Sequence, residues 1–128
     1  MGQIKLETLI KAPAEICFNL SRNIDVHMHS MKYTDECAVA GVRTGHIGLY
    51  ETVTWHARHF GIMLQMTVQI TSMEYPLSFT DEQVKGPFKK LKHTHIFQPG
   101  KGGNTLMIDN FEFKAPYGII GMLVDKIL

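Results

Sequence analysis

The chain is short of cysteine, of net charge and of long apolar runs, and each shortage excludes a class of protein. Its 128 residues include two cysteines, too few for the disulfide framework of a small secreted domain. Thirteen lysines and arginines against twelve aspartates and glutamates leave a formal net charge of +1, which argues against a nucleic-acid binder. No apolar run approaches the roughly 18 residues of a membrane span. We therefore expect one cytoplasmic domain, residues 1–128, with no nucleic-acid partner and no integral membrane association.

What the chain has is alternation of apolar and polar residues, the pattern of half-buried strands. Hydrophobic residues make up 45% of the chain, enough for a core. The most regular strand covers residues 62–71, where Ile62, Leu64, Met66, Val68 and Ile70 share one face. Further strands are predicted over residues 3–10, 36–40, 46–59, 77–85, 91–97 and 105–114.

Helical spacing occurs in three places. Pro13 opens a short helix over residues 13–22, whose apolar stripe contains Cys17, and a second short helix follows over residues 25–31. Pro116 opens a third helix at the end of the chain. This order predicts an α+β domain with a curved antiparallel sheet of about seven strands, two short helices, and a C-terminal helix over the concave face.

Several stretches of the sequence also resemble a known superfamily. They are IKAPAE at 10–15, YETVTW at 50–55, FTDE at 79–82, GPF at 86–88, HTH at 93–95, DNFEF at 109–113 and PYG at 116–118. Together with the element order they resemble the START and polyketide-cyclase (SRPBCC) superfamily, which has the helix-grip fold. Its gripping helix usually runs much longer than residues 116–128, so we expect that helix to be truncated here.

The resemblance implies a deep apolar cavity between sheet and helix that holds a lipid, a sterol, a polyketide or another small hydrophobic molecule. Many members only bind their ligand, and some catalyse cyclisation or dehydration in the cavity. No cofactor is implied.

Four polar residues, Glu51, His93, His95 and Asp109, fall on strand faces that are otherwise apolar. Burying an unpaired carboxylate costs several kcal/mol, so such groups pair, bind something or shift their pKa values. A meander places the last two long strands side by side, where Asp109 can meet His93 or His95. A carboxylate beside an imidazole fixes its tautomer and raises its basicity, as general acid–base chemistry requires.

This cluster has several interpretations: a structural network, a group that orients a ligand, or a catalytic pair with His93 or His95 as base and Asp109 as its orienting partner. A His-x-His strand with carboxylates also has ligand chemistry for zinc or iron. The glutamate that a cupin site would need after His95 is missing, however, and we expect no metal. A bulge at Gly86-Pro87 would reverse the register, so the sequence does not decide which histidine faces the cavity.

The sequence favours a binding module for one small hydrophobic molecule. The expected apolar wall consists of Trp55, Met66, Phe79, Phe97 and Phe111, and Glu51, His93, His95 and Asp109 are expected to orient the polar atoms of the ligand. The alternatives are a cyclase or dehydratase that uses the same cavity, and a docking domain in which the pocket is vestigial. Whether the chain catalyses a reaction, which ligand it takes, and whether it is a monomer or a homodimer stay open.

Overall fold

The structure is a computed structural model that describes residues 2–30, 35–59 and 62–114. In chain order the elements are β1 (Gly2–Ile10), α1 (Ala14–Ser21), α2 (Ile24–Ser30), β2 (Cys37–Gly41), β3 (Thr52–His59), β4 (Ile62–Glu74), β5 (Ser78–Lys85), β6 (Lys90–Pro99), the short 3-10 helix η2 (Lys101–Gly103) and β7 (Thr105–Lys114). Neither α-helix has the length and apolar character needed to cross a bilayer, nor does any other helix in the described part of the chain.

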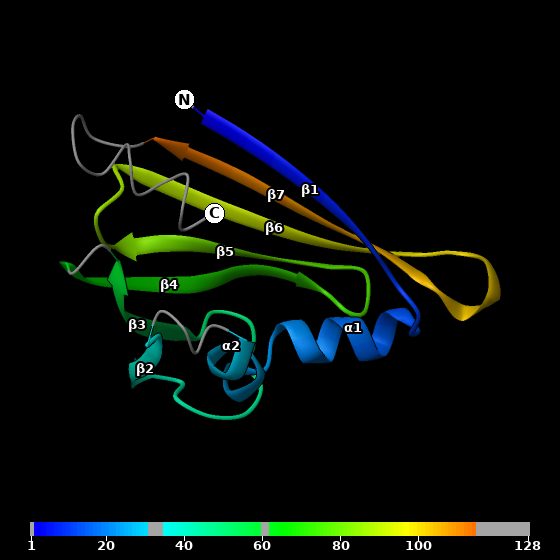
Figure 1. Cartoon of the computed structure of the whole chain (residues 1–128), viewed down its shortest axis with the longest axis horizontal. Coiled ribbons are helices and arrows are strands. Elements are labelled where there is room, and N and C mark those ends of the chain that lie inside the picture. Colours follow the sequence, from blue (N-terminus) through cyan, green and yellow to red (C-terminus); the bar gives the residue numbers. More distant parts are fainter. Residues whose placement is uncertain (1, 31–34, 60–61, 115–128) are drawn as a thin grey trace.

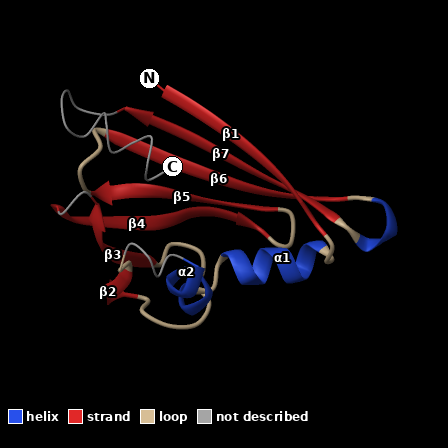
Figure 2. Cartoon of the chain, viewed as in Figure 1, coloured by secondary structure: helices blue, strands red, loops and turns tan. Residues whose placement is uncertain are grey.

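The strands form one seven-stranded sheet in the order β1-β7-β6-β5-β4-β3-β2, and all neighbours are antiparallel. Strands β2 to β7 are a meander, and β1 returns to pair with β7 (Figure 1). Figure 2 shows the extent of this sheet against the two short helices. The predicted α+β architecture with a curved antiparallel sheet is confirmed.

Most predicted boundaries lie within a few residues of the observed ones, and the strand over 105–114 has the predicted limits. Strand β4 continues to Glu74, beyond the predicted end at residue 71. The strand predicted over 46–59 is too long, because β3 begins only at Thr52. The predicted C-terminal helix from Pro116 lies outside the described residues.

Two irregularities mark the pairing of β4 with β5, in the middle of the sheet. The register shifts once between Thr67 and Val68 and again between Ile70 and Ser72. Bulges of this kind bend a strand and increase its local twist, which curves the sheet around its inner face.

Helix α1 covers one end of the concave face. Its buried residues are Ala14, Cys17 and Phe18, at the spacing of one helical face. The Phe18 ring meets Phe79 and Phe97 edge to face, with centroids 5.3 and 5.5 Å away. Thr105, at the start of β7, is fully buried and donates a 2.7 Å hydrogen bond to the Ala12 carbonyl, which fixes the chain just before the helix. This end of the molecule is a solid core.

Candidate functional site

Beyond the α1 end, the concave face opens into a cavity of about 680 Å³. Its lining residues come from both α-helices, from strands β3 to β7 and from the end of β1. Most of the wall is apolar, and it includes Trp55, Val68, Ile70, Phe79, Leu91 and Phe111. Ligand pockets in proteins typically measure about 300–1,000 Å³, so this cavity has the size of a binding site.

Seven of the nine predicted site residues line this cavity. They are Trp55, Met66, Phe79, His93, His95, Asp109 and Phe111. Both histidines face inward, because β6 pairs with its two neighbours without a register shift around them. The sequence did not decide which of the two histidines faces the cavity, and in the structure both do.

The prediction that Glu51 faces the cavity is wrong. Glu51 is exposed, precedes β3, and accepts a 2.7 Å hydrogen bond from the Gly48 amide through Oε1. Its neighbour Tyr50 has a left-handed φ of 65°, which breaks the extended backbone that the predicted strand over 46–59 required. With the strand interrupted, alternation no longer assigns Glu51 to the inner face.

The prediction that Phe97 is part of the cavity wall is also wrong. Phe97 shares the inner face of β6 with the two histidines, but it is 0% exposed and packs beneath Phe18 of α1. It belongs to the solid core, because α1 fills the space in front of Phe97. Alternation within β6 gives no information about where that helix packs.

Three neighbouring strands bring four polar residues together on the cavity wall. Strand β6 contributes His93 and His95, β7 contributes Asp109, and β5 contributes Asp81, which the sequence reasoning missed. Asp81 lies two residues after Phe79, a predicted inner-face residue, so the same alternation could have placed it there. We call these four residues the Asp–His cluster.

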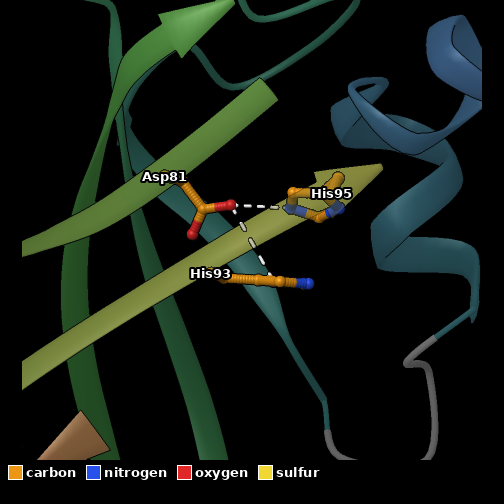
Figure 3. A group of neighbouring side chains, drawn as sticks. All are labelled: Asp81, His93 and His95. Carbon is orange, nitrogen blue, oxygen red and sulfur yellow. Dashed lines mark hydrogen bonds and ion pairs between the residues drawn. The ribbon is translucent and has the colours of Figure 1, made fainter. Parts of the chain in front are cut away.

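Each histidine in the Asp–His cluster bonds to the aspartate diagonal to it across the ladder. His93 Nε2 lies 2.8 Å from Asp109 Oδ1, and His95 Nε2 lies 2.8 Å from Asp81 Oδ2. In the strand pairing, His95 lies directly opposite Asp109 of β7, and His93 lies directly opposite Asp81 of β5. The longer approaches are 3.9 Å, from His93 Nδ1 to Asp81 Oδ2, and 3.5 Å, from His95 Nδ1 to Asp109 Oδ1. Figure 3 shows Asp81 aimed at both imidazoles.

The two imidazoles also belong to a stack of four rings. His93 and His95 stack with centroids 3.6 Å apart; Phe79 lies 4.0 Å beyond His95, and Phe111 lies 3.9 Å beyond His93. The phenyl rings hold both imidazoles in place from outside, so the histidines have little freedom to turn away from the aspartates.

Burial and pairing shift the pKa values of two members in the same direction. Burial is the largest influence on the pKa of His95 and holds it below the ordinary 6.5, against the opposing effect of the hydrogen bond with Asp81. Burial would raise the pKa of Asp81, but the hydrogen bond from His95 and the nearby histidines outweigh it and lower that pKa below 3.8. Near neutral pH, Asp81 is therefore an anion and His95 a neutral imidazole. Because a carboxylate only accepts, His95 donates to Asp81 through its Nε2 hydrogen.

A second polar pair lies on the cavity wall at α2. His27 of α2 bonds through Nε2 to Oε1 of Glu36, and both residues line the cavity. The His27 ring also packs on Trp55, with centroids 4.4 Å apart. The pair joins a helix to the segment before β2, and alternation within single strands carries no signal for such a contact.

The Asp–His cluster is a poor metal site in spite of its composition. Ligand atoms of Asp81, His93 and His95 lie within 4.8 Å of one another. A metal ion binds in the plane of each imidazole, about 2.0–2.1 Å from the nitrogen. The two rings are stacked with centroids 3.6 Å apart and an interplanar angle of 30°, so an ion close to a nitrogen in the plane of one ring lies out of the plane of the other. One ring would have to leave the stack before both histidines could hold the same ion.

No family model and no curated protein matches the sequence, but solved structures match the fold. The protein TTHA0849 from Thermus thermophilus superposes with a TM-score of 0.75 at 20% identity, over 98% of this chain and 83% of that one. The chain has the helix-grip fold. This confirms the fold that the sequence predicted.

Two further structures share this fold, and the name of one of them states an activity. Ginseng major latex-like protein 151 from Panax ginseng has a TM-score of 0.68 at 15% identity, over 98% of this chain and 89% of that one. The Zhui aromatase/cyclase from Streptomyces sp. R1128 has a TM-score of 0.71 at 11% identity, over 91% of this chain and 70% of that one. At these identities the comparison establishes the fold.

Proposed function

We propose that the protein binds one small hydrophobic molecule, such as a lipid, a sterol or a polyketide, in the cavity between the sheet and the helices. The observation that carries this proposal is a cavity of about 680 Å³ whose largely apolar wall is interrupted by the Asp–His cluster. Apolar surface with a few fixed polar groups is the usual composition of a ligand site, in which the apolar part gives affinity and the polar part gives orientation. A cavity of this size does not fit a docking domain with a vestigial pocket.

Binding of a neutral, environment-sensitive dye such as Nile red tests this function. We expect saturable binding with a blue-shifted emission, and a clear loss of affinity in Trp55→Ala, because the indole is part of the wall. Arg58→Ala is the matched control on the same strand, since Arg58 is exposed and does not line the cavity. Absence of saturable binding to the wild-type protein would overturn the proposal.

Trp55 is also a core residue, so its removal can unfold the protein. A second variant, Leu64→Trp, adds volume to a half-buried position on the cavity wall instead of removing it. We expect Leu64→Trp to weaken dye binding while circular dichroism and thermal unfolding stay close to those of the wild type. Full-strength binding in a folded Leu64→Trp would show that the dye binds elsewhere.

The paired histidines and aspartates favour a second candidate, an enzyme of the cyclase or dehydratase kind. In each histidine, Nε2 is occupied by an aspartate at 2.8 Å, so Nδ1 is the nitrogen that can take a proton from a carbon next to a carbonyl group. With a synthetic poly-β-ketone, His93→Ala or His95→Ala should then lower the cyclisation rate by roughly 10²–10⁴-fold while dye binding persists. Unchanged rates in both variants would leave only the binding function.

A further inference from the structure

We propose that the cavity selects a hydrophobic ligand that carries an organic cation, such as an aryl or alkyl amine, over an equally large carboxylic acid. This inference rests on the proposed binding function and specifies the charge of its ligand. It follows from the charges that face the cavity, from the hydrogen-bonding capacity that they leave unused, and from the aromatic surface around them.

The charged groups of the described cavity wall are mostly acidic. Asp81 and Asp109 face the cavity from β5 and β7, and Glu36 faces it beside α2. The one permanent cation among the described lining residues is Arg22, and its guanidinium is already engaged. Arg22 donates through Nε to the Asn19 side chain at 3.0 Å and through another nitrogen to the Ile47 carbonyl at 3.1 Å. The described wall therefore has three carboxylates and one permanent cation, and that cation is already engaged.

The Asp–His cluster offers a ligand mainly acceptors. In each histidine Nε2 is used on an aspartate, which leaves Nδ1 of the neutral His95 and the second oxygen of each carboxylate as acceptors. Within the described residues neither Asp81 Oδ1 nor Asp109 Oδ2 has a hydrogen-bond partner, and no side-chain oxygen is both buried and unpaired. Both oxygens are therefore accessible, and in Figure 3 the second oxygen of Asp81 points away from both imidazoles.

An ammonium group matches this arrangement, because it brings positive charge and several N–H donors to acceptors that lack partners. A carboxylate ligand would bring a third negative charge beside two aspartates and would meet mainly acceptors in the Asp–His cluster. The surrounding wall suits the apolar part of an amine, since Phe79 and Phe111 lie at the two ends of the ring stack. Low polarity in the cavity strengthens both the attraction and the repulsion.

Competition against Nile red tests the inference with three probes of one shape: naphthylethylamine, naphthylethanol and naphthylpropionic acid. At neutral pH the first is a cation, the second is neutral and the third is an anion. We expect the amine to displace the dye at least about tenfold more effectively than the alcohol, and the acid to be the weakest. Equal potency of the three probes, or an order led by the acid, would overturn the inference.

Two variants test whether the Asp–His cluster causes the selection. Asp109→Asn removes one charge and keeps the shape, and we expect it to reduce the preference for the amine at least about fivefold. Glu112→Gln is the matched control, because it removes the same charge from the opposite face of β7, where Glu112 pairs with Lys92 of β6. Glu112→Gln should bind Nile red as the wild type does, and the probe preference of Asp109→Asn is taken relative to its own affinity for Nile red. A preference that survives in Asp109→Asn, or one that Glu112→Gln also reduces, would contradict the role of the cluster.

The outcomes separate this inference from the function on which it rests. If Nile red itself does not bind, the proposed function is wrong. If Nile red binds and the potency of the three probes does not depend on their charge, only the inference is wrong. Zinc chloride added to chelator-treated protein gives the remaining outcome. Stoichiometric zinc binding that is lost in His93→Ala would identify the cluster as a metal site and would overturn the preference for an organic cation.

Discussion

The concave face of the sheet has two halves that are built from the same strands but have opposite interiors. Under α1, Phe97 of β6 is 0% exposed and meets the equally buried Phe18 of the helix. Further back along β6, His95 and His93 occupy the same face and line the cavity. Phe79 lies at the boundary, since its ring contacts both Phe18 and His95.

The comparison shows that a strand face does not determine by itself whether it becomes core or cavity. The outcome depends on whether a helix supplies a side chain that fills the space in front of it. Polar groups are tolerated on the open half because they pair with one another and keep 12–18% of their side chains exposed. The solid half has no comparable cluster among its described residues.

The largest effect that distinguishes the halves should come from Phe18→Ala. This change removes a ring that three aromatic neighbours surround, Tyr75, Phe79 and Phe97, so we expect a loss of about 3–5 kcal/mol in the free energy of unfolding. Ile16→Ala on the same helix is the control, because Ile16 is 50% exposed and should change stability by no more than about 0.5 kcal/mol. Chemical denaturation measures both. Similar losses in the two variants would show that α1 does not build the core in this way.

A smaller effect should follow when the Asp–His cluster in the open half is broken. His95→Leu leaves the Asp81 carboxylate without its donor, and we expect a loss of about 1–3 kcal/mol. Adding Asp81→Leu should recover part of that loss, because the unpaired acceptor is then removed as well. A double-mutant cycle followed by urea denaturation measures this coupling. Strictly additive losses would mean that the hydrogen bond between His95 and Asp81 does not contribute to stability.

The pH dependence of stability should be smaller again, because titration changes one proton and leaves the packing intact. The pKa of His95 in the folded protein is below its ordinary 6.5, so the unfolded chain takes up the proton first as the pH falls. His95 therefore lowers stability progressively below about pH 6.5. Asp81 has a lowered pKa in the folded protein, and the stability that it contributes above pH 3.8 is lost only in stronger acid.

Thermal unfolding between pH 7.5 and 4.5 measures this dependence on His95. The variant His95→Gln should lose less stability over the interval than the wild type, although it starts from a lower value. His56→Gln is the control for the substitution itself, since His56 does not line the cavity. An unaltered slope in His95→Gln would contradict the assigned direction of the pKa shift.

Alternation was sufficient to predict most strand boundaries and to choose residues of which seven in nine line the cavity, because in a long strand each side chain's face follows from its neighbours. Residues 105–114 form a strand with the predicted limits, and Asp109 and Phe111 both face the cavity. Alternation from Phe79 could have placed Asp81 on the inner face, and the two neighbours of β6 in the meander would have placed it beside the histidines, since the aspartates approach them from opposite sides. The signal was present in the sequence, and it depended on strand order as much as on pattern.

The incorrect and missed site residues have a common physical cause. Each position depended on a helix contact or a backbone change that the alternation within one strand does not show. The position of Phe97 depended on where α1 packs, and the contact of His27 with Glu36 depended on how α2 meets the segment before β2. The position of Glu51 depended on one residue, Tyr50, whose left-handed backbone ends the extended run. Periodicity shows no sign of such a break, because the residue types before and after it continue to alternate.

The smallest effect is expected at Glu51, and it tests whether the open half of the concave face extends to that residue. Glu51→Ala removes an exposed hydrogen bond to the Gly48 amide, so stability should fall by less than about 1 kcal/mol. Nile red affinity should stay within about twofold of the wild type, because the carboxylate lies outside the cavity wall. Parallel titrations of Glu51→Ala and Trp55→Ala make the comparison. Equal losses of affinity would place Glu51 in the ligand site, as the sequence had suggested, and would require the segment before β3 to move inward when a ligand binds.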